Sequence, residues 1–232
     1  MSGFFMSHLM TRTRIGIFIW IAVFFFSGTE GPVMANTREI KLPPPATRGE
    51  ISLEEAIARR RSARTFSDQT LTIEQIGQLL WAAQGITGSA GGISLRSAPS
   101  AGALYPMEIY ALTQDGAYHY LPQKHTLEVL EERDLRNDLS RACLSQDPVR
   151  EAALTIVICA VYERVTGKYR ERGKRYVDVE AGHIAQNVLL QAVAMGLGSV
   201  PIGAFDDDRV RDLLNLPEEQ IPICIIPVGY KK

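Results

Sequence analysis

A short loop of small residues is the stretch of this chain best suited to meet a ligand. Residues 96–106 read Arg-Ser-Ala-Pro-Ser-Ala-Gly-Ala-Leu-Tyr-Pro, so two prolines bracket a run of small side chains. Small side chains leave backbone N–H groups open to an approaching ligand, and Gly102 can adopt a positive φ where a turn requires it. An ordinary surface turn would have the same composition. The choice between the two depends on the other motifs.

A cluster of basic residues forms the second motif with chemical potential. Arg59, Arg60 and Arg61 are consecutive, and Ser62 and Arg64 follow where a helix is expected to give way to extended chain. Guanidinium groups bind phosphate through two parallel hydrogen bonds, and a hydroxyl group can add another. Most runs of charge are simply solvated surface. The cluster therefore indicates a phosphate site only in combination with other evidence.

The third motif covers residues 198–206, Gly-Ser-Val-Pro-Ile-Gly-Ala-Phe-Asp. Pro201 and Gly203 make a narrow backbone edge, which suits a flat ring that approaches the main chain. A tight turn after a helix would explain the same residues. This motif taken alone favours the turn.

The elements that must position these motifs are a mixture of helices and strands. Capping boxes at Ser52 and Thr72 predict two helix starts, and Asp115-Gly116 predicts a hairpin turn. The expected helices cover 52–60, 72–84, most of 127–144, a short segment from Pro148, 179–195 and a segment after Asp206. The expected strands cover 108–113, 117–120, 153–162 and 221–228, and 88–94 is expected to be a glycine-serine loop. Strict alternation of strand and helix is absent, so the pattern predicts an α+β fold.

Composition narrows the function classes. The chain has 25 Lys and Arg against 26 Asp and Glu, a net charge of −1. That balance does not favour nucleic acid as a partner.

The cysteines number three and form no CxxC pair, so neither a structural metal nor a disulfide framework is expected. The helix expected over 179–195 is apolar except for Glu180, His183, Asn187 and Gln191, which predicts burial in the core and in a subunit interface.

The N-terminal segment has the features of an export signal. Arg12 and Arg14 precede an apolar run over 15–26, and Val33-Met-Ala35 ends in the small-residue pattern of a cleavage site. We expect residues 1–35 to be a signal peptide and the protein to be exported, with an uncleaved membrane anchor as the second possibility. Residues 36–49 are expected to be an extended proline-rich arm with neither helix nor strand, and 50–232 to be one domain.

Taken together, the motifs resemble the FMN-dependent nitroreductase family over about residues 50–230. The matching pieces are Arg-Arg-Ser-Ala-Arg-Thr-Phe (60–66), Pro-Ser-Ala-Gly-Ala-Leu-Tyr-Pro (99–106), Glu-Ala-Gly-His-Ile-Ala-Gln-Asn (180–187), Gly-Leu-Gly-Ser-Val-Pro-Ile-Gly-Ala-Phe (196–205) and Pro-Val-Gly-Tyr (227–230). The second and third pieces look most like the SagB-type branch, whose known members oxidise thiazolines and oxazolines in peptides to azoles. The resemblance implies a mixed sheet flanked by helices, in a homodimer with FMN at the subunit interface.

The resemblance also assigns residues to the flavin. It gives the phosphate, ribityl chain and pyrimidine edge to Arg60, Arg61, Ser62 and Arg64. It gives the isoalloxazine ring of the other subunit's flavin to Pro99, Ser100, Ala101 and Gly102. Gly203 and Ala204 occupy the place whose backbone amide faces the flavin N5 region. Lys231 and Lys232 either provide the basic contact that the C-terminal tail makes in many relatives, or the contact is absent.

A catalytic base is implied at Lys168-Tyr169, which lies where the azoline-oxidising members carry a Lys-Tyr pair. An exposed charged loop is the alternative interpretation, and His183 is more readily explained as an interface residue than as an acid or base. The expected reaction moves a hydride through flavin N5 to or from a small organic or peptide-derived substrate.

Three functions remain open from the sequence. The first is a dehydrogenase that draws electrons from its substrate, which export favours because it would place the protein away from nicotinamide cofactors. The second is an NAD(P)H-dependent reductase of nitro compounds or quinones. The third is a flavin-binding or dimeric interaction protein without turnover.

Overall fold

The computed structural model describes residues 38–232, so the signal peptide expected over 1–35 lies outside the described residues. A seven-stranded sheet with the order β1-β6-β5-β4-β7-β9-β8 organises this part of the chain. Its strands are β1 Glu39–Lys41, β4 Met107–Thr113, β5 Gly116–Leu121, β6 Thr126–Glu131, β7 Leu154–Ala160, β8 Gly198–Ser199 and β9 Ile221–Gly229. A separate antiparallel ribbon pairs β2 Ile86–Ala90 with β3 Ile93–Arg96.

Helices cover both faces of the sheet. They are α1 Leu53–Arg59, α2 Ile73–Gln84, α3 Arg136–Ala142, α4 Asp147–Glu151, α5 Glu163–Tyr169, α6 Arg172–Ala194 and α7 Asp207–Leu213, with a 3₁₀ turn η1 at Ala101–Ala103. The strand ladders are antiparallel, and a parallel bridge between Ser62 and Ser199 makes the sheet mixed. The structure confirms the expected α+β fold with a mixed sheet flanked by helices.

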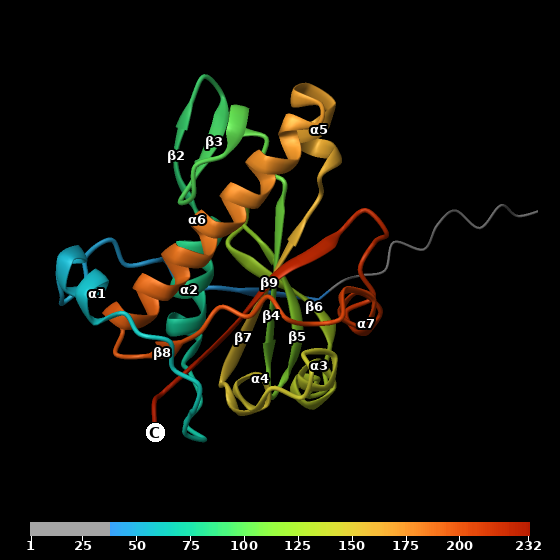
Figure 1. Cartoon of the computed structure of the whole chain (residues 1–232). Helices are drawn as coiled ribbons and strands as arrows, with labels where there is room; N and C mark the ends of the chain where they lie inside the picture. The colour runs from blue at the N-terminus through green and yellow to red at the C-terminus, as the bar shows by residue number, and fades with distance from the viewer. Residues whose placement is uncertain (1–37) are drawn as a thin grey trace, which may run out of the picture. The chain divides into compact units, whose positions relative to one another are not determined.

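The core consists of two apolar clusters, one on each face of the sheet. All seven residues of β7 are buried, because helices lie against both of its faces. On β4, Ile109 and Ala111 join the cluster under α2 and α6, whereas Tyr110 and Leu112 join the cluster under α3 and α7. This alternation is the period-two pattern of a strand between two layers. Figure 1 shows α6 crossing one face of the sheet diagonally beside α2.

Local capping begins three helices where the sequence predicts them. The Ser52 hydroxyl accepts a hydrogen bond from the Glu55 amide at 3.1 Å and begins α1. Thr72 and Gln75 form a reciprocal capping box at the start of α2. The Asp206 carboxylate caps α7 by accepting from the Arg209 amide. Each cap satisfies a backbone donor that the first helical turn leaves without a partner.

Several expected elements were wrong. Residues 127–144 are not mainly helical, because Leu127 and its neighbours in β6 pair with β5 and β1 before α3 begins. The expected loop over 88–94 is a ribbon that turns at Gly91 and Gly92, both with positive φ. The proline-rich arm contains a strand, since β1 adds an edge to the sheet.

Helix α6 is longer than expected and is not buried all round. Its buried residues are Gly173, Val177, Glu180, Ala181, Ile184, Val188, Leu189 and Ala192. Val179 and His183 are exposed. The described part of the chain contains no helix that is both long and apolar enough to cross a membrane.

Candidate functional site

A basic pocket of about 390 Å³ lies between the end of α1, the end of α6 and the C-terminal tail. Its polar and charged lining comes from Arg59, Arg61, Ser62, Arg64, Thr65, Lys231 and Lys232. We call this site the basic pocket. Arg60 does not line it; its backbone carbonyl instead accepts a hydrogen bond from Arg61 Nη1 at 2.8 Å. The structure therefore brings together four residues predicted to bind the cofactor, Arg61, Ser62, Arg64 and Lys231, and leaves Arg60 beside them.

Backbone pairing holds the two sides of the basic pocket together. Ser62 bridges to Ser199, and the Ala63 amide donates to the Ser199 carbonyl at 3.1 Å. On the other side, Phe66 bridges to Lys231, which brings the C-terminal tail alongside the arginine-rich segment. The candidate cations are thus placed by main-chain hydrogen bonds rather than by long side chains alone.

Gly198 allows the tail to pass close to this segment. A Cβ atom at position 198 would lie 2.6 Å from Lys231 Cγ and 2.6 Å from Ala63 Cβ. Separations this short do not occur between carbon atoms in contact. Only glycine lets the aliphatic part of Lys231 run across β8 toward the basic pocket. Lys232 is held differently, by an ion pair with Glu151 at 3.3 Å.

The small-residue loop, residues 96–106, lies against α6 on the N-terminal side of the basic pocket, with Ser100 near Glu180 and the Ser97 carbonyl accepting from Asn187 Nδ2 at 3.3 Å. Gly102, Ala103 and Tyr105 all have positive φ, at 66°, 53° and 47°. Left-handed backbone is costly for residues other than glycine, and such strain clusters at functional sites. The loop also holds the predicted cofactor residues Pro99, Ser100 and Ala101. The prediction that Gly102 adopts a positive φ is confirmed.

The predicted Lys168-Tyr169 pair lies directly against this loop. A Cβ atom added to Gly102 would be 2.8 Å from Tyr169 Oη and 3.0 Å from Lys168 Nζ. The pair ends helix α5 and is not in a loop, although Lys168 is exposed as the alternative interpretation expected. Tyr169 packs edge to face on Tyr176 of α6, with ring centroids 5.2 Å apart. The contact brings together two regions, loop and pair, that are distant in the sequence.

Arg164 fastens α5 to the same loop. Its Nη1 donates to the Tyr105 carbonyl at 3.3 Å, and its Nη2 lies 2.5 Å from Glu108 Oε1. Arg164 and His119 both lower the pKa of the Glu108 carboxyl, although burial acts in the opposite direction and is the largest single influence. Sequence reasoning missed Arg164, because its partners lie more than fifty residues away and no motif marks them.

Sequence reasoning assigned Glu180 no role of its own. The helical spacing grouped it with His183 in one polar stripe; in the structure Glu180 is only 2% exposed and lies beneath the small-residue loop, whereas His183 is exposed. Burial raises the pKa of its carboxyl above 4.5, with Ser100, Gln84 and Arg96 acting in the opposite direction. The sequence signal that could have indicated a buried, functional Glu180 was a charged residue on a largely apolar helix.

Gly203 and Ala204 follow an extended segment that runs along β9. Gly198 and Ser199 pair with β9, and Ile202 bridges to Ile225. Gly203 is exposed, with open space where a Cβ atom would point, and the Ala204 carbonyl accepts from Gln146 Nε2 at 2.9 Å. Neither residue lines the basic pocket. The exposed backbone at Gly203 is the feature that the sequence predicted for the approach of a flat ring.

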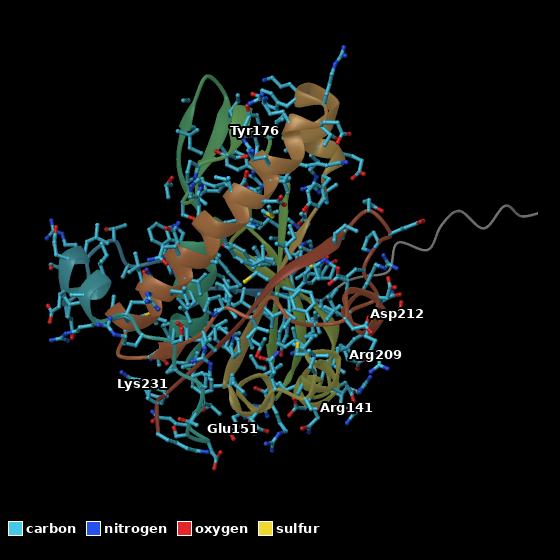
Figure 2. The ribbon with its side chains drawn as sticks, in the orientation of Figure 1. Arg141, Glu151, Tyr176, Arg209, Asp212 and Lys231 are labelled. Carbon is cyan, nitrogen blue, oxygen red and sulfur yellow. The ribbon has the colours of Figure 1, made fainter. Side chains whose placement is uncertain are left out.

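The two halves of the candidate site are far apart within one chain. Glu180 is the α6 residue beneath Ser100 of the loop and Val193 lines the basic pocket, and thirteen helical residues at 1.5 Å each separate them by about 20 Å. Figure 2 shows Tyr176 toward one end of α6 and Lys231 near the other. A single chain does not bring the predicted ring-binding loop to the predicted phosphate site.

Thiol and metal chemistry have little support in the described residues. Burial raises the pKa of the Cys143 thiol to about 12 and that of Cys224 to about 11, so neither is a ready nucleophile. Cys159 is fully buried in β7. Residues 38–232 contain no group of three acidic, His or Cys side chains placed to hold a metal ion.

A model of the nitroreductase family matches residues 57–230, most of the chain. The chain belongs to the nitroreductase family. It is therefore a flavin oxidoreductase of this family. The chain is 39% identical over 204 residues to MJ1384 of Methanocaldococcus jannaschii, a protein named as a nitroreductase, and the alignment covers 85% of this chain and 99% of the relative.

Solved structures share the nitroreductase fold. One from Ralstonia eutropha, assigned to the nitroreductases, has a TM-score of 0.73 and 29% identity, and the match covers 86% of this chain and 92% of that one. The Escherichia coli microcin synthetase McbBCD complex, with truncated pro-MccB17 bound, has a TM-score of 0.66 and 25% identity over 95% of this chain and 85% of that one.

The residues of this family member fit a flavin mononucleotide. The basic pocket combines guanidinium, hydroxyl and ammonium donors, which is the donor set that a phosphate monoester requires. The loop end supplies small residues and an exposed main chain, which a planar ring requires. The side chains that would bind the two ends of a flavin are thus present, at opposite ends of α6.

Proposed function

We propose that this protein is an FMN-dependent oxidoreductase of the SagB-type branch, which oxidises a peptide-derived or other small organic substrate. The observation that carries the proposal is the contact of Lys168 and Tyr169 with Gly102 of the small-residue loop. A candidate base then lies beside the loop that the family resemblance assigns to the flavin ring. The likeness to the peptide-bound McbBCD complex supports a peptide as one substrate class.

We further propose that the active unit is a homodimer that completes each flavin site from both subunits. The basic pocket of one subunit would hold the phosphate of FMN, and the small-residue loop of its partner would cover the ring. This arrangement removes the separation of about 20 Å that α6 imposes within one chain. It also accounts for a basic pocket whose Arg61, Ser62 and Arg64 are exposed in the single chain.

The residues of the chain then have distinct roles. Arg61, Ser62 and Lys231 bind the phosphate through charge-assisted hydrogen bonds. Arg64 places a cation toward the polar edge of the ring, where positive charge favours the reduced flavin. Bound FMN would accept the two electrons of the oxidation. Lys168 and Tyr169 take the proton that the substrate loses, with the tyrosine held by Tyr176.

Export gives this oxidation a direction. Outside the cytoplasm little nicotinamide cofactor is present, so electrons would enter from the organic substrate and leave to oxygen or a membrane quinone. The predicted signal peptide over residues 1–35 is the basis of this step. Cell fractionation of the native host tests it, and protein found only in the cytoplasm would contradict it.

An NAD(P)H-dependent reductase of nitro compounds or quinones is the second candidate. The observation in its favour is the likeness to MJ1384, which covers nearly the whole of that relative. Such a reductase would need the same basic pocket and ring-binding loop but no base at Lys168 and Tyr169. The pair is therefore the feature on which the two candidates differ.

The deciding experiment uses purified protein reconstituted with FMN under anaerobic conditions. The proposal predicts that the flavin absorbance persists on addition of NADH or NADPH and bleaches with an azoline-containing peptide. Rapid bleaching by either nicotinamide would favour the reductase. The K168M/Y169F variant should bind FMN normally, but its flavin should not be bleached by the peptide. A wild-type protein that binds no FMN would refute both candidates.

A further inference from the structure

A chain of buried polar side chains connects the small-residue loop to the middle of α6. Gln84 at the end of α2 is fully buried, and Glu180 on α6 is 2% exposed. Arg96 Nη1 donates to Gln84 Oε1 at 2.9 Å, and Gln84 Nε2 donates to Glu180 Oε1 at 3.4 Å. The amide of Gln84 is therefore oriented from both ends, by a guanidinium on one side and a carboxyl on the other.

The same chain of contacts closes on the loop through Ser100. The Ser100 hydroxyl is close enough to the Glu180 carboxyl to lower its pKa, and the Ser100 oxygen accepts from the Tyr105 amide at 2.9 Å. A hydroxyl has one donor and two acceptor positions, so it can serve both partners at once. The Tyr105 hydroxyl in turn accepts from the Arg96 amide at 3.2 Å, and the Arg96 guanidinium lies 4.7 Å from the Tyr105 ring centroid. Glu180 is the member of this circuit that belongs to α6.

The cost of this arrangement indicates a role beyond packing. Removing a carboxyl group from water costs free energy, and an apolar side chain of similar size would fill the same space more cheaply. The loop above it holds Ala103 and Tyr105 in left-handed backbone, which persists only where surrounding contacts impose it. Glu180 and Ser100 provide such a contact at the base of the strained segment.

We propose that Glu180 is a positioning residue that holds the small-residue loop in its ring-binding conformation through Ser100 and the Gln84–Arg96 link. The inference rests on the proposed function, since it concerns the loop assigned to the flavin ring. In this role Glu180 itself contacts neither substrate nor cofactor. It fixes the backbone of residues 99–105, so that the flavin meets a loop that is already ordered.

The test compares Glu180→Ala, Glu180→Gln and the control Glu171→Gln, whose carboxyl is exposed before α6. Amide hydrogen exchange of the flavin-free protein reports loop order without any ligand. We expect Glu180→Ala to raise exchange over 99–105 about tenfold and to weaken FMN binding about tenfold, the usual result of leaving buried donors unpaired. Glu180→Gln keeps an acceptor and should remain within about threefold of wild type. The control should match wild type.

A Ser100→Ala variant keeps the test decisive even where Glu180→Ala fails to fold. It removes the loop partner and leaves α6 intact, so it should loosen the same residues, and the double variant should add nothing further. Wild-type exchange over 99–105 in Ser100→Ala and Glu180→Ala would overturn the inference, as would an equal rise throughout α6 and the sheet. Failure of the wild type to bind FMN would refute the proposed function. The hydrogen exchange of the flavin-free protein would still test whether Glu180 orders residues 99–105.

Discussion

Gly102 has a conformation and a neighbourhood that only glycine can combine. Its φ is 66°, and an added Cβ atom would approach Tyr169 Oη to 2.8 Å and Lys168 Nζ to 3.0 Å. We expect Gly102→Ala to cost about 1–2 kcal/mol in folding free energy and to displace the pair. Peptide oxidation should fall about tenfold or more, because a small misplacement of a reacting group is costly. Gly167→Ala on α5, with open space around its Cβ, is the matched control; equal turnover by both variants would contradict the argument.

Lys231 and Lys232 are adjacent lysines with different surroundings. Lys232 pairs with Glu151, whereas the aliphatic part of Lys231 crosses Gly198 toward the basic pocket. A charge-assisted hydrogen bond to phosphate is worth about 1.5–3 kcal/mol, so Lys231→Met should weaken FMN binding at least tenfold. Lys232→Met should weaken it much less. Fluorescence titration with FMN measures both affinities. A larger effect at Lys232 would show that Lys232, and not Lys231, makes the phosphate contact.

The buried carboxyl of Glu180 should make stability depend on pH. Its pKa is raised above the ordinary 4.5 by burial, so the folded protein holds a proton there that the unfolded chain releases. Glu180 therefore destabilises the folded state as pH rises from 4.5 through the raised value. Glu180→Gln removes this penalty, so the variant should gain stability relative to wild type between pH 4.5 and pH 8. Urea unfolding at both pH values measures the difference, and an unchanged difference would show that the carboxyl is solvated.

Helix α5 depends on Arg164 for its docking against the small-residue loop. The guanidinium joins the Tyr105 carbonyl to the Glu108 carboxylate, one on the loop and one on β4. We expect Arg164→Met to loosen the Lys168-Tyr169 pair and lower kcat about tenfold. FMN affinity should stay within about twofold of wild type, because the basic pocket lies at the other end of α6. A loss of FMN binding equal to the loss of turnover would place Arg164 in the flavin site itself.

The elements that the sequence predicts correctly are those set by neighbouring residues. The caps at Ser52, Thr72 and Asp206 act within one helical turn, so each helix start could be found from four residues. Strand β6 was missed, because its apolar residues also fit a helical spacing and only pairing with β1 and β5 excludes it. The ribbon β2–β3 was missed because glycine and serine are typical of loops.

The residues of the candidate site also divide into those that a local motif reveals and those that depend on distant partners. The basic pocket and the small-residue loop come from short contiguous motifs, and both could be predicted from the sequence. Glu180 and Arg164 act through partners eighty and fifty-nine positions away in the chain, which no local pattern reveals. Arg60 was included because the family resemblance assigns it to the flavin together with Arg61, although it does not line the basic pocket.

At the scale of the whole molecule, the separation of the two half-sites along α6 predicts a specific result for mixed dimers. One variant, Arg64→Ala with Lys231→Met, damages the basic pocket. The other, Gly102→Ala with Lys168→Met, damages the loop and the pair. Each homodimer should be inactive, because both of its sites contain a damaged half. A mixed dimer with shared sites contains one site built from two damaged halves and one built from two intact halves.

Random association places half of the subunits in mixed dimers, so a 1:1 mixture should recover about a quarter of wild-type peptide oxidation. The variants are co-expressed with different tags, and the doubly tagged species is isolated, since it should carry about half of the wild-type activity per dimer. Sites contained within single chains would give no recovery, because every chain carries a damaged half. Recovery in the doubly tagged species would therefore show that α6 holds apart two halves that only a partner subunit can join.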